Sequence, residues 1–212
     1  MDIQDSAADL PIQSSQELVS SRVFNAVEET FTFGETGGTL SRIFIQHLSA
    51  VAVLAVNEDD EVLLINQYRH PVRMNLWEIP AGLLDVEGEP LLETAQRELA
   101  EEADLRAENW YTLTDFYTTP GASDEAIRVY LAQGLSEIPH GERHTRQAEE
   151  AEITTAWVPL KEAVEAVLAG KIHNPSAANA ILALHAVRTD VGSLRDARAP
   201  WPDHPRSSVI RP

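Results

Sequence analysis

Three glutamates, Glu98, Glu101 and Glu102, lie within five residues of one another in a run that reads as helix. Because positions three and four apart on a helix are neighbours, the three carboxylates share one face. Two such charges about 6 Å apart repel by roughly 2–3 kcal/mol at an effective dielectric near 20. A hard divalent cation would relieve that repulsion, and an all-oxygen set without cysteine or a nearby histidine favours Mg²⁺ or Mn²⁺ over Zn²⁺.

The alternative interpretation of these acids is a solvated helix face. Arg97 has a glutamate four residues away on either side, Glu93 and Glu101, and such pairs are common on exposed helices. Apolar residues recur at helical spacing and predict the buried stripe: Leu92, Ala95, Leu99 and Ala103. The acids therefore face away from the core, towards the loop formed by residues 80–88.

The spacing of these residues resembles the signature of the Nudix hydrolases. That signature runs glycine, five residues, glutamate, seven residues, and then Arg-Glu-apolar-any-Glu-Glu-any-Gly-apolar. The matching residues here are Gly82, Glu89, Arg97, Glu98, Leu99, Glu101, Glu102 and Leu105.

The chain departs from this signature at two places. Six residues separate Gly82 from Glu89, so Leu83 holds the formal glycine position. Asp104 replaces the glycine that ends the helix. Aspartate tolerates the left-handed backbone conformation better than most residues, so Asp104 can end the helix in its place. Neither departure removes a metal-binding acid.

The composition narrows the classes of protein to be considered. The chain has 212 residues, 43% of them hydrophobic, which suits one globular domain with an appendage. It has no cysteine, which excludes disulfides, zinc–thiolate sites and thiol catalysis. A formal net charge of −18 argues against nonspecific binding to nucleic acid or to an anionic membrane. Without a long apolar run or a basic, apolar N-terminus, the protein is expected to be soluble and cytoplasmic.

The expected strands are mixed with helices and joined by hairpins, which predicts an α+β fold with a mixed sheet. The Nudix resemblance implies an α/β/α sandwich. We expect three regions: an N-terminal strand region at 1–47, a Nudix domain at 48–190, and a flexible, proline-rich tail at 191–212. Within the first region we expect short strands at 23–27, 30–33 and 42–45.

Three flanking features resemble bacterial ADP-ribose pyrophosphatases. They are Gln67-Tyr68-Arg69 followed by the stretch 77–82, the stretch 119–125 with Pro120 fifteen residues after Leu105, and the N-terminal strand region with Arg42. The resemblance implies metal-dependent hydrolysis of ADP-ribose to AMP and ribose 5-phosphate by a homodimer whose N-terminal segments help to complete the partner's site. Two alternatives remain: hydrolysis of a nucleotide sugar, NADH or a dinucleoside polyphosphate, and a sensing module that does not cleave its ligand. The retained carboxylates argue against the sensing module.

The resemblance also assigns roles to residues. Glu98 and Glu102 are the expected metal ligands together with the Ala81 carbonyl. Glu101 is expected to be either a further ligand or a residue that contacts the ligands. The structural residues of the signature are Gly82, Glu89 and Arg97. The residues expected to bind substrate are Arg42, Arg69, Glu78 and Pro120. Arg69 can offer a planar guanidinium fork to phosphate oxygens, with a surface ion pair as the alternative.

The general base is expected outside the signature. In the resembling subfamily a glutamate on a late loop activates the water, and the corresponding loop here is 140–152. Its distance from the following strand matches Glu149 or Glu150, of which we favour Glu150. Each could instead be a solvated loop acid.

If Glu150 is the base, Glu150→Gln should lower kcat by roughly 10²–10⁴-fold, the usual share of general-base catalysis. Metal affinity should stay unchanged, because the signature carboxylates remain. Steady-state kinetics and metal titration of Glu150→Gln and Glu149→Gln separate the two candidates. A large effect of Glu149→Gln alone would shift the assignment by one residue, and an effect of neither would direct attention to Glu101 and Glu125.

Overall fold

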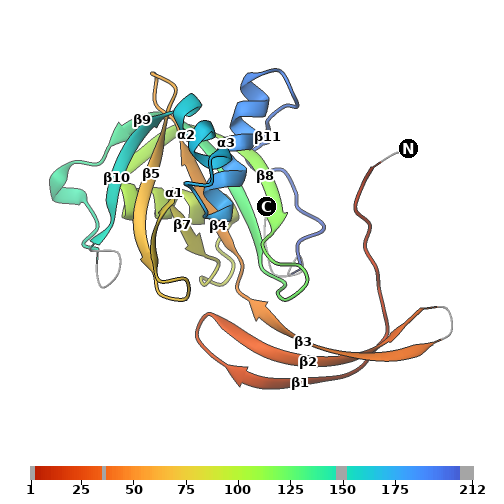
Figure 1. Ribbon diagram of the computed structural model, residues 1–212. Coiled ribbons are helices and arrows are strands. Elements are labelled where there is room, and N and C mark those ends of the chain that lie inside the picture. The colour runs from red at the N-terminus through yellow and green to blue at the C-terminus, as the bar shows by residue number, and fades with distance from the viewer. Residues whose placement is uncertain (1–2, 35–36, 147–151, 206–212) are drawn as a thin grey trace.

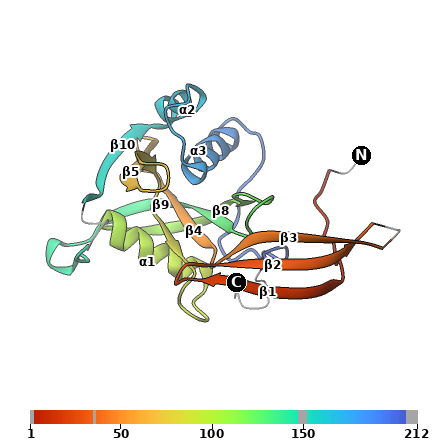
Figure 2. The same cartoon turned by 60° about the horizontal axis from the view of Figure 1, so that its bottom comes forward.

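The computed structural model describes residues 3–34, 37–146 and 152–205. It has a body in which helices cover both faces of a sheet, and a separate N-terminal sheet that lies along one side of the body and extends beyond it (Figures 1 and 2). Within the described residues, no helix is both long enough and apolar enough to cross a membrane.

The N-terminal sheet has three antiparallel strands in the order β1-β2-β3. They are β1 Ile12–Ser20, β2 Phe24–Phe33 and β3 Gly38–His47. The two short strands expected at 23–27 and 30–33 are one strand, because Glu28 and Glu29 continue the ladder opposite Ile43 and Arg42. The strand β1 was not predicted.

The body contains a five-stranded sheet in the order β11-β8-β9-β4-β7. Its strands are β4 Ala50–Ala55, β7 Ala81–Leu83, β8 Leu105–Tyr117, β9 Ala126–Glu137 and β11 Arg195–Asp196. Strand β4 runs parallel to β9 and the other pairs are antiparallel, so the predicted mixed sheet is confirmed. A second sheet pairs β5 Glu61–Arg69 with β6 Met74–Glu78 and β10 Thr154–Pro159.

The hydrophobic core lies on both faces of β4, whose six residues are all buried. Ala52 and Leu54 face one cluster, which α2 Leu160–Leu168 and α3 Pro175–Arg188 cover. Val51 and Val53 face the other cluster, which α1 Leu91–Ala103 covers. Side chains alternate between the two faces of a strand, so a strand that is apolar throughout needs cover on both sides. The α/β/α sandwich is therefore confirmed, with α1 opposite α2 and α3 (Figure 2).

The N-terminal sheet is attached to the body through the end of β3. The Ile45 N–H donates to the Ala122 carbonyl at 2.9 Å, and the Asp124 N–H donates to the Ile45 carbonyl at 3.1 Å. The Asp124 carboxylate accepts a hydrogen bond from the His47 N–H at 2.7 Å. The loop between β8 and β9 thus joins the two sheets, which places Pro120 beside β3.

A C-terminal strap, residues 195–204, packs against β8 and β9. Arg128 is 1% exposed and donates to both Asp115 carboxylate oxygens, at 2.8 and 2.9 Å. The same guanidinium donates to the Ala199 carbonyl at 2.6 Å and lies 5.3 Å from the centre of the Trp201 ring. The strap supplies the acceptor and the ring that this buried cation needs.

The strap belongs to the tail expected at 191–212, and it makes specific contacts with the body. Strand β11 pairs with β8, the Tyr117 hydroxyl donates to the Asp203 carbonyl at 2.6 Å, and His204 is 2% exposed. Proline-rich composition removes backbone donors, but it leaves carbonyls free to accept from Arg128 and Tyr117.

We expect Arg128→Met to lower the free energy of unfolding by about 3–5 kcal/mol, because it leaves Asp115 without its buried partner. Arg195 is the matched control, since it donates to the same carboxylate at 2.8 Å but is 44% exposed. Arg195→Gln should cost about 0–1 kcal/mol. Chemical denaturation measures both, and equal losses would contradict the assignment of Arg128 as the anchor of the strap.

Candidate active site

Helix α1 carries the signature residues. Its buried face includes the predicted Leu92, Ala95 and Leu99, of which Ala95 and Leu99 are 0% exposed. The helix ends at Asp104, which has φ +56° and whose N–H donates to the Leu99 carbonyl. The predicted left-handed end at Asp104 is therefore confirmed. Of the acids, Glu98 packs towards Gly82 and Glu102 is buried beside Ala81, so both face the start of the signature loop.

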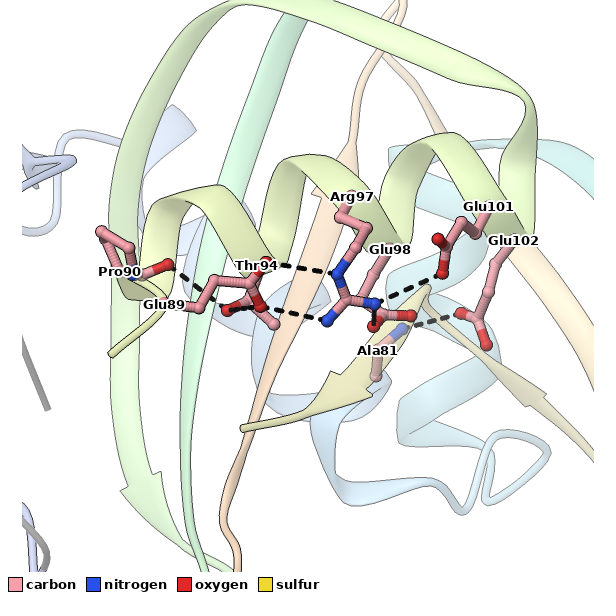
Figure 3. Close-up of polar contacts among 8 residues, drawn as sticks. All are labelled: Ala81, Glu89, Pro90, Thr94, Arg97, Glu98, Glu101 and Glu102. Atoms are coloured by element: carbon pink, nitrogen blue, oxygen red, sulfur yellow. Dashed lines mark hydrogen bonds and ion pairs between the residues drawn. The ribbon is translucent and has the colours of Figure 1, made fainter. Parts of the chain in front are cut away.

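The Arg97 guanidinium lies among three of the carboxylates (Figure 3). It donates to both oxygens of Glu89, at 3.3 and 3.2 Å. It also donates to Glu98, and to Glu101 at 3.3 Å. Glu89 comes from the loop before the helix, so this one cation both joins loop to helix and reduces the repulsion between the acids.

Burial and hydrogen bonding compete at this cluster. Burial alone would raise the pKa of Glu89, but hydrogen bonds from Arg97 and from the Thr94 hydroxyl, at 2.9 Å, hold that pKa below its usual value. Burial alone would lower the pKa of Arg97, but the adjacent carboxylates raise it. Both groups therefore stay charged at neutral pH. Sequence reasoning missed Thr94, although its place one turn before Arg97 is a signal that could have found it.

Glu98 packs directly against Gly82. A Cβ added to residue 82 would lie 2.0 Å from Glu98 Cδ, far inside van der Waals contact. The glycine that this arrangement needs is therefore Gly82, not the formal signature position held by Leu83. The extra loop residue is accommodated between Gly82 and Glu89.

Glu102 is held by the strand that precedes the loop. Its side chain accepts a hydrogen bond from the Ala81 N–H at 2.9 Å, and the residue is only 7% exposed. Ala81 lies in β7, which pairs with β4 in the core. The last turn of α1 and the start of the signature loop are thus fixed relative to each other, with Ala81 beside Glu102 (Figure 3).

The residues around α1 fit a hard divalent cation by donor type. Glu98, Glu101 and Glu102 are oxygen donors on one face of one helix, and Ala81 adds backbone beside them. Within the described residues, no three His, Asp or Glu side chains already converge as a metal cluster. Glu98 and Glu101 accept hydrogen bonds from Arg97, and Glu102 accepts one from the Ala81 N–H.

Arg69 and Glu78 form an ion pair with each other. Arg69 Nε and Nη2 donate to the two Glu78 oxygens at 2.9 and 2.8 Å, and Glu78 is 2% exposed. This face of the Arg69 guanidinium is therefore occupied by Glu78. The expected role of Arg69 in phosphate binding stays a prediction.

The remaining expected residues fall into two groups. Arg42 and Pro120 line one groove of about 510 Å³ between β3 and the loop after β8, together with Phe44 and Tyr117. Glu149 and Glu150 lie outside the described residues. The structure thus brings the signature residues together on α1 and β7, and it brings Arg42 and Pro120 together in the groove.

We expect Gly82→Ala to displace the Glu98 side chain and to weaken Mg²⁺ or Mn²⁺ binding by at least about tenfold, the scale seen when the surroundings of metal ligands are disturbed. Gly141→Ala is the matched control, because a Cβ there meets nothing within 4 Å and no positive φ is involved. Calorimetric metal titration of both variants checks this. Unchanged affinity in Gly82→Ala would show that Glu98 does not need its place over Gly82.

Comparison with solved structures shows that another protein has the same fold. A structure described as "Crystal structure of ADP compounds hydrolase" superposes with a TM-score of 0.69 at 20% identity, covering 89% of this chain and 99% of that one. At this level of identity the likeness concerns the fold alone.

Comparison of sequences identifies the family. The chain is 45% identical over 175 residues to the ADP-ribose pyrophosphatase of Mycobacterium tuberculosis, covering 82% of this chain and 83% of that protein. It is 32% identical over 169 residues to the ADP-ribose pyrophosphatase of Bacillus subtilis, covering 79% and 88%. The profile of the NUDIX domain matches residues 46–179, which include α1 and all of its acids. The chain therefore belongs to the Nudix family.

Proposed function

We propose that this protein hydrolyses the diphosphate of ADP-ribose to AMP and ribose 5-phosphate, with Mg²⁺ as its metal. The observation that carries the proposal is the cluster of Glu98, Glu101 and Glu102 on one face of α1, with Glu98 seated over Gly82. The similarity to two ADP-ribose pyrophosphatases, each over about four fifths of the chain, supports the choice of substrate.

A diphosphate resists hydrolysis because the water must approach a phosphorus that is already surrounded by negative charge. A divalent cation held by Glu98 and Glu102, with Glu101 and the Ala81 carbonyl, would neutralise this charge, orient water and lower the pKa of that water. Mg²⁺ suits such a set because it prefers oxygen ligands and binds beside substrate phosphates.

The chain itself positions these groups. Arg97 keeps Glu98 and Glu101 on the face they share, and the Ala81 N–H fixes Glu102 against β7. Proton removal from the attacking water falls to Glu150 in this proposal, with Glu149 as the alternative, because a general base must reach the water while the signature acids are occupied.

The groove beside β3 suits a nucleotide. Its lining residues include Arg42, the aromatic residues Phe44 and Tyr117, and Pro120. Aromatic rings offer stacking surface to a base, and a guanidinium offers charged donors to phosphate. In a chain of net charge −18, such local cations are what an anionic substrate requires.

We also propose that the protein is a homodimer formed through the N-terminal sheet. The ladder register places Val19 opposite Ala26 and Ala26 opposite Ile45, so Val19 lies on the same face as Phe24 and Ile43. These three apolar side chains are 56%, 40% and 63% exposed. A second copy of the chain would cover this face and bring its own N-terminal sheet to the groove.

The function is tested by resolving products. With ADP-ribose and Mg²⁺, the protein should yield AMP and ribose 5-phosphate in equal amounts, and exhaustive EDTA treatment should abolish turnover. NADH and a nucleotide sugar, assayed alongside, should have lower kcat/KM. Faster turnover of either would assign a different substrate, and full activity after EDTA would contradict the metal site.

Glu98→Gln and Glu102→Gln should each lower kcat by at least a few hundred-fold, because several kcal/mol of transition-state stabilisation are lost with a ligand charge. The fold should survive, since neutralising either side chain also reduces carboxylate repulsion. Kinetics and thermal melting are measured together. Near-normal kcat with a steep fall in Tm would mean that the two acids are structural only.

Val19→Asp combined with Ile43→Asp should convert the dimer to monomer in light scattering, because two charges would be buried in the interface. Leu168→Asp is the matched control, since Leu168 is 75% exposed at the end of α2, away from the N-terminal sheet. A wild-type chain that is monomeric, or a variant that remains dimeric, would rule out this interface.

A further inference from the structure

Asp104, where the chain departs from the Nudix signature, does more than end α1. Its Oδ2 accepts a hydrogen bond from Arg146 Nη2 at 2.6 Å. The same guanidinium donates through Nε to the Glu101 carbonyl at 2.8 Å. One arginine thus binds both the carboxylate that follows the helix and a backbone carbonyl in the last turn, one residue before Glu102.

The stability cost of this arrangement argues that ending the helix is not the only role of Asp104. Asp104 adopts φ +56°, which glycine adopts without strain. Its Oδ1 is buried and has no hydrogen-bond partner within the described residues, and a buried acceptor of this kind reduces stability. A glycine would avoid both costs, so the carboxylate matters for what it binds.

Other contacts bring the same segment to the same place. The Ile138 N–H donates to the Asp104 carbonyl at 2.8 Å, and Arg143 Nε donates to the Ile138 carbonyl at 3.0 Å. The segment 138–146 therefore follows the end of α1, and Arg146 is its last residue before 147–151. The expected base, Glu150 or Glu149, follows Arg146 by three or four residues.

We propose that Asp104 and Arg146 form a positioning pair for catalysis, which fixes the chain that enters the base-bearing residues against the end of the metal-binding helix. This inference rests on the proposed function. The pair touches neither substrate nor metal. It acts through geometry, because a base must lie within hydrogen-bond reach of the water and a misplacement of about 1 Å can lower the rate about 10²-fold.

The competing explanation is that Asp104 only ends the helix and Arg146 only caps it. That explanation predicts that Asp104→Asn and Asp104→Gly are harmless, because asparagine and glycine are the residues most often found at such helix ends. The positioning pair predicts the reverse: Asp104→Gly removes the acceptor of Arg146, Asp104→Asn replaces the charged acceptor by a weaker, neutral amide oxygen, and both should lower kcat.

The test is a cycle of variants assayed with ADP-ribose and Mg²⁺. Asp104→Asn, Asp104→Gly and Arg146→Gln are each made alone, and Asp104→Asn is combined with Arg146→Gln. Asp104→Asn is also combined with Glu150→Gln, or with Glu149→Gln if that variant has the larger effect. Glu142→Gln is the control. Glu142 lies in the same segment, 138–146, and the substitution removes its surface ion pair with Arg106. Affinity and stoichiometry for a methylene-bridged ADP-ribose analogue are measured with Tm.

We expect each single substitution at Asp104 or Arg146 to lower kcat about tenfold or more, with KM, analogue stoichiometry and Tm close to wild type. The Asp104–Arg146 double variant should lose no more than either single variant. In the variant that lacks the base, Asp104→Asn should not lower kcat further. If the role of Asp104 were purely structural, kcat would fall in that background as well. Glu142→Gln should match wild type.

Three results would overturn the proposal. They are wild-type kcat in Asp104→Gly, which has no acceptor for Arg146, losses that multiply in the double variant, and a full further loss in the base-deficient background. Failure of the proposed function is separate, because it appears in the wild-type chain as absence of ADP-ribose turnover. The cycle then applies to whichever nucleoside diphosphate derivative the wild type hydrolyses, and turnover of none overturns both proposals.

Discussion

The arrangement around α1 depends on one cation among carboxylates. Arg97 donates to Glu89, Glu98 and Glu101, in a chain whose net charge is −18. Without that guanidinium, acids on one helix face would repel one another and also the loop that must lie beside them. Because Glu89 belongs to the loop, the same contact fixes the loop on the helix, and this places Gly82 under Glu98. The contacts of Arg97 therefore both compensate the negative charges and set the position of the loop.

Much of the body could be predicted because its signals are local. The apolar run of β4 and the helical spacing of Ala95 and Leu99 describe burial directly, and the structure confirms both. Strand β1 gave no such signal, since all nine of its residues are exposed and it exists through pairing with β2. Arg128, in the middle of a buried strand, has its partners Asp115 and Ala199 thirteen and seventy-one residues away. Periodicity carries no information about such contacts.

The site, too, could be predicted from the sequence only in part. Spacing identified the acids and the left-handed end at Asp104, but it placed Gly82 one residue away from the formal position of the signature glycine. Only the contact with Glu98 shows that Gly82 serves as that glycine, since this is a matter of volume. Spacing likewise allowed Arg69 to face a phosphate, whereas the fork meets Glu78 on the neighbouring strand. The link between Asp104 and Arg146 spans forty-two residues and follows from how the end of β9 returns to α1.

The Arg128 anchor has a consequence for the order in which the chain is made. During translation β8 and β9 emerge together and can pair at once, and Asp115 is then available to Arg128. The Ala199 carbonyl and the Trp201 ring emerge seventy or more residues later. Until they arrive, the guanidinium must keep water as its remaining partner, because a buried donor without an acceptor is costly. The surface of β8 and β9 around Arg128 is therefore closed to water only after residues 199–201 have emerged from the ribosome and packed against it.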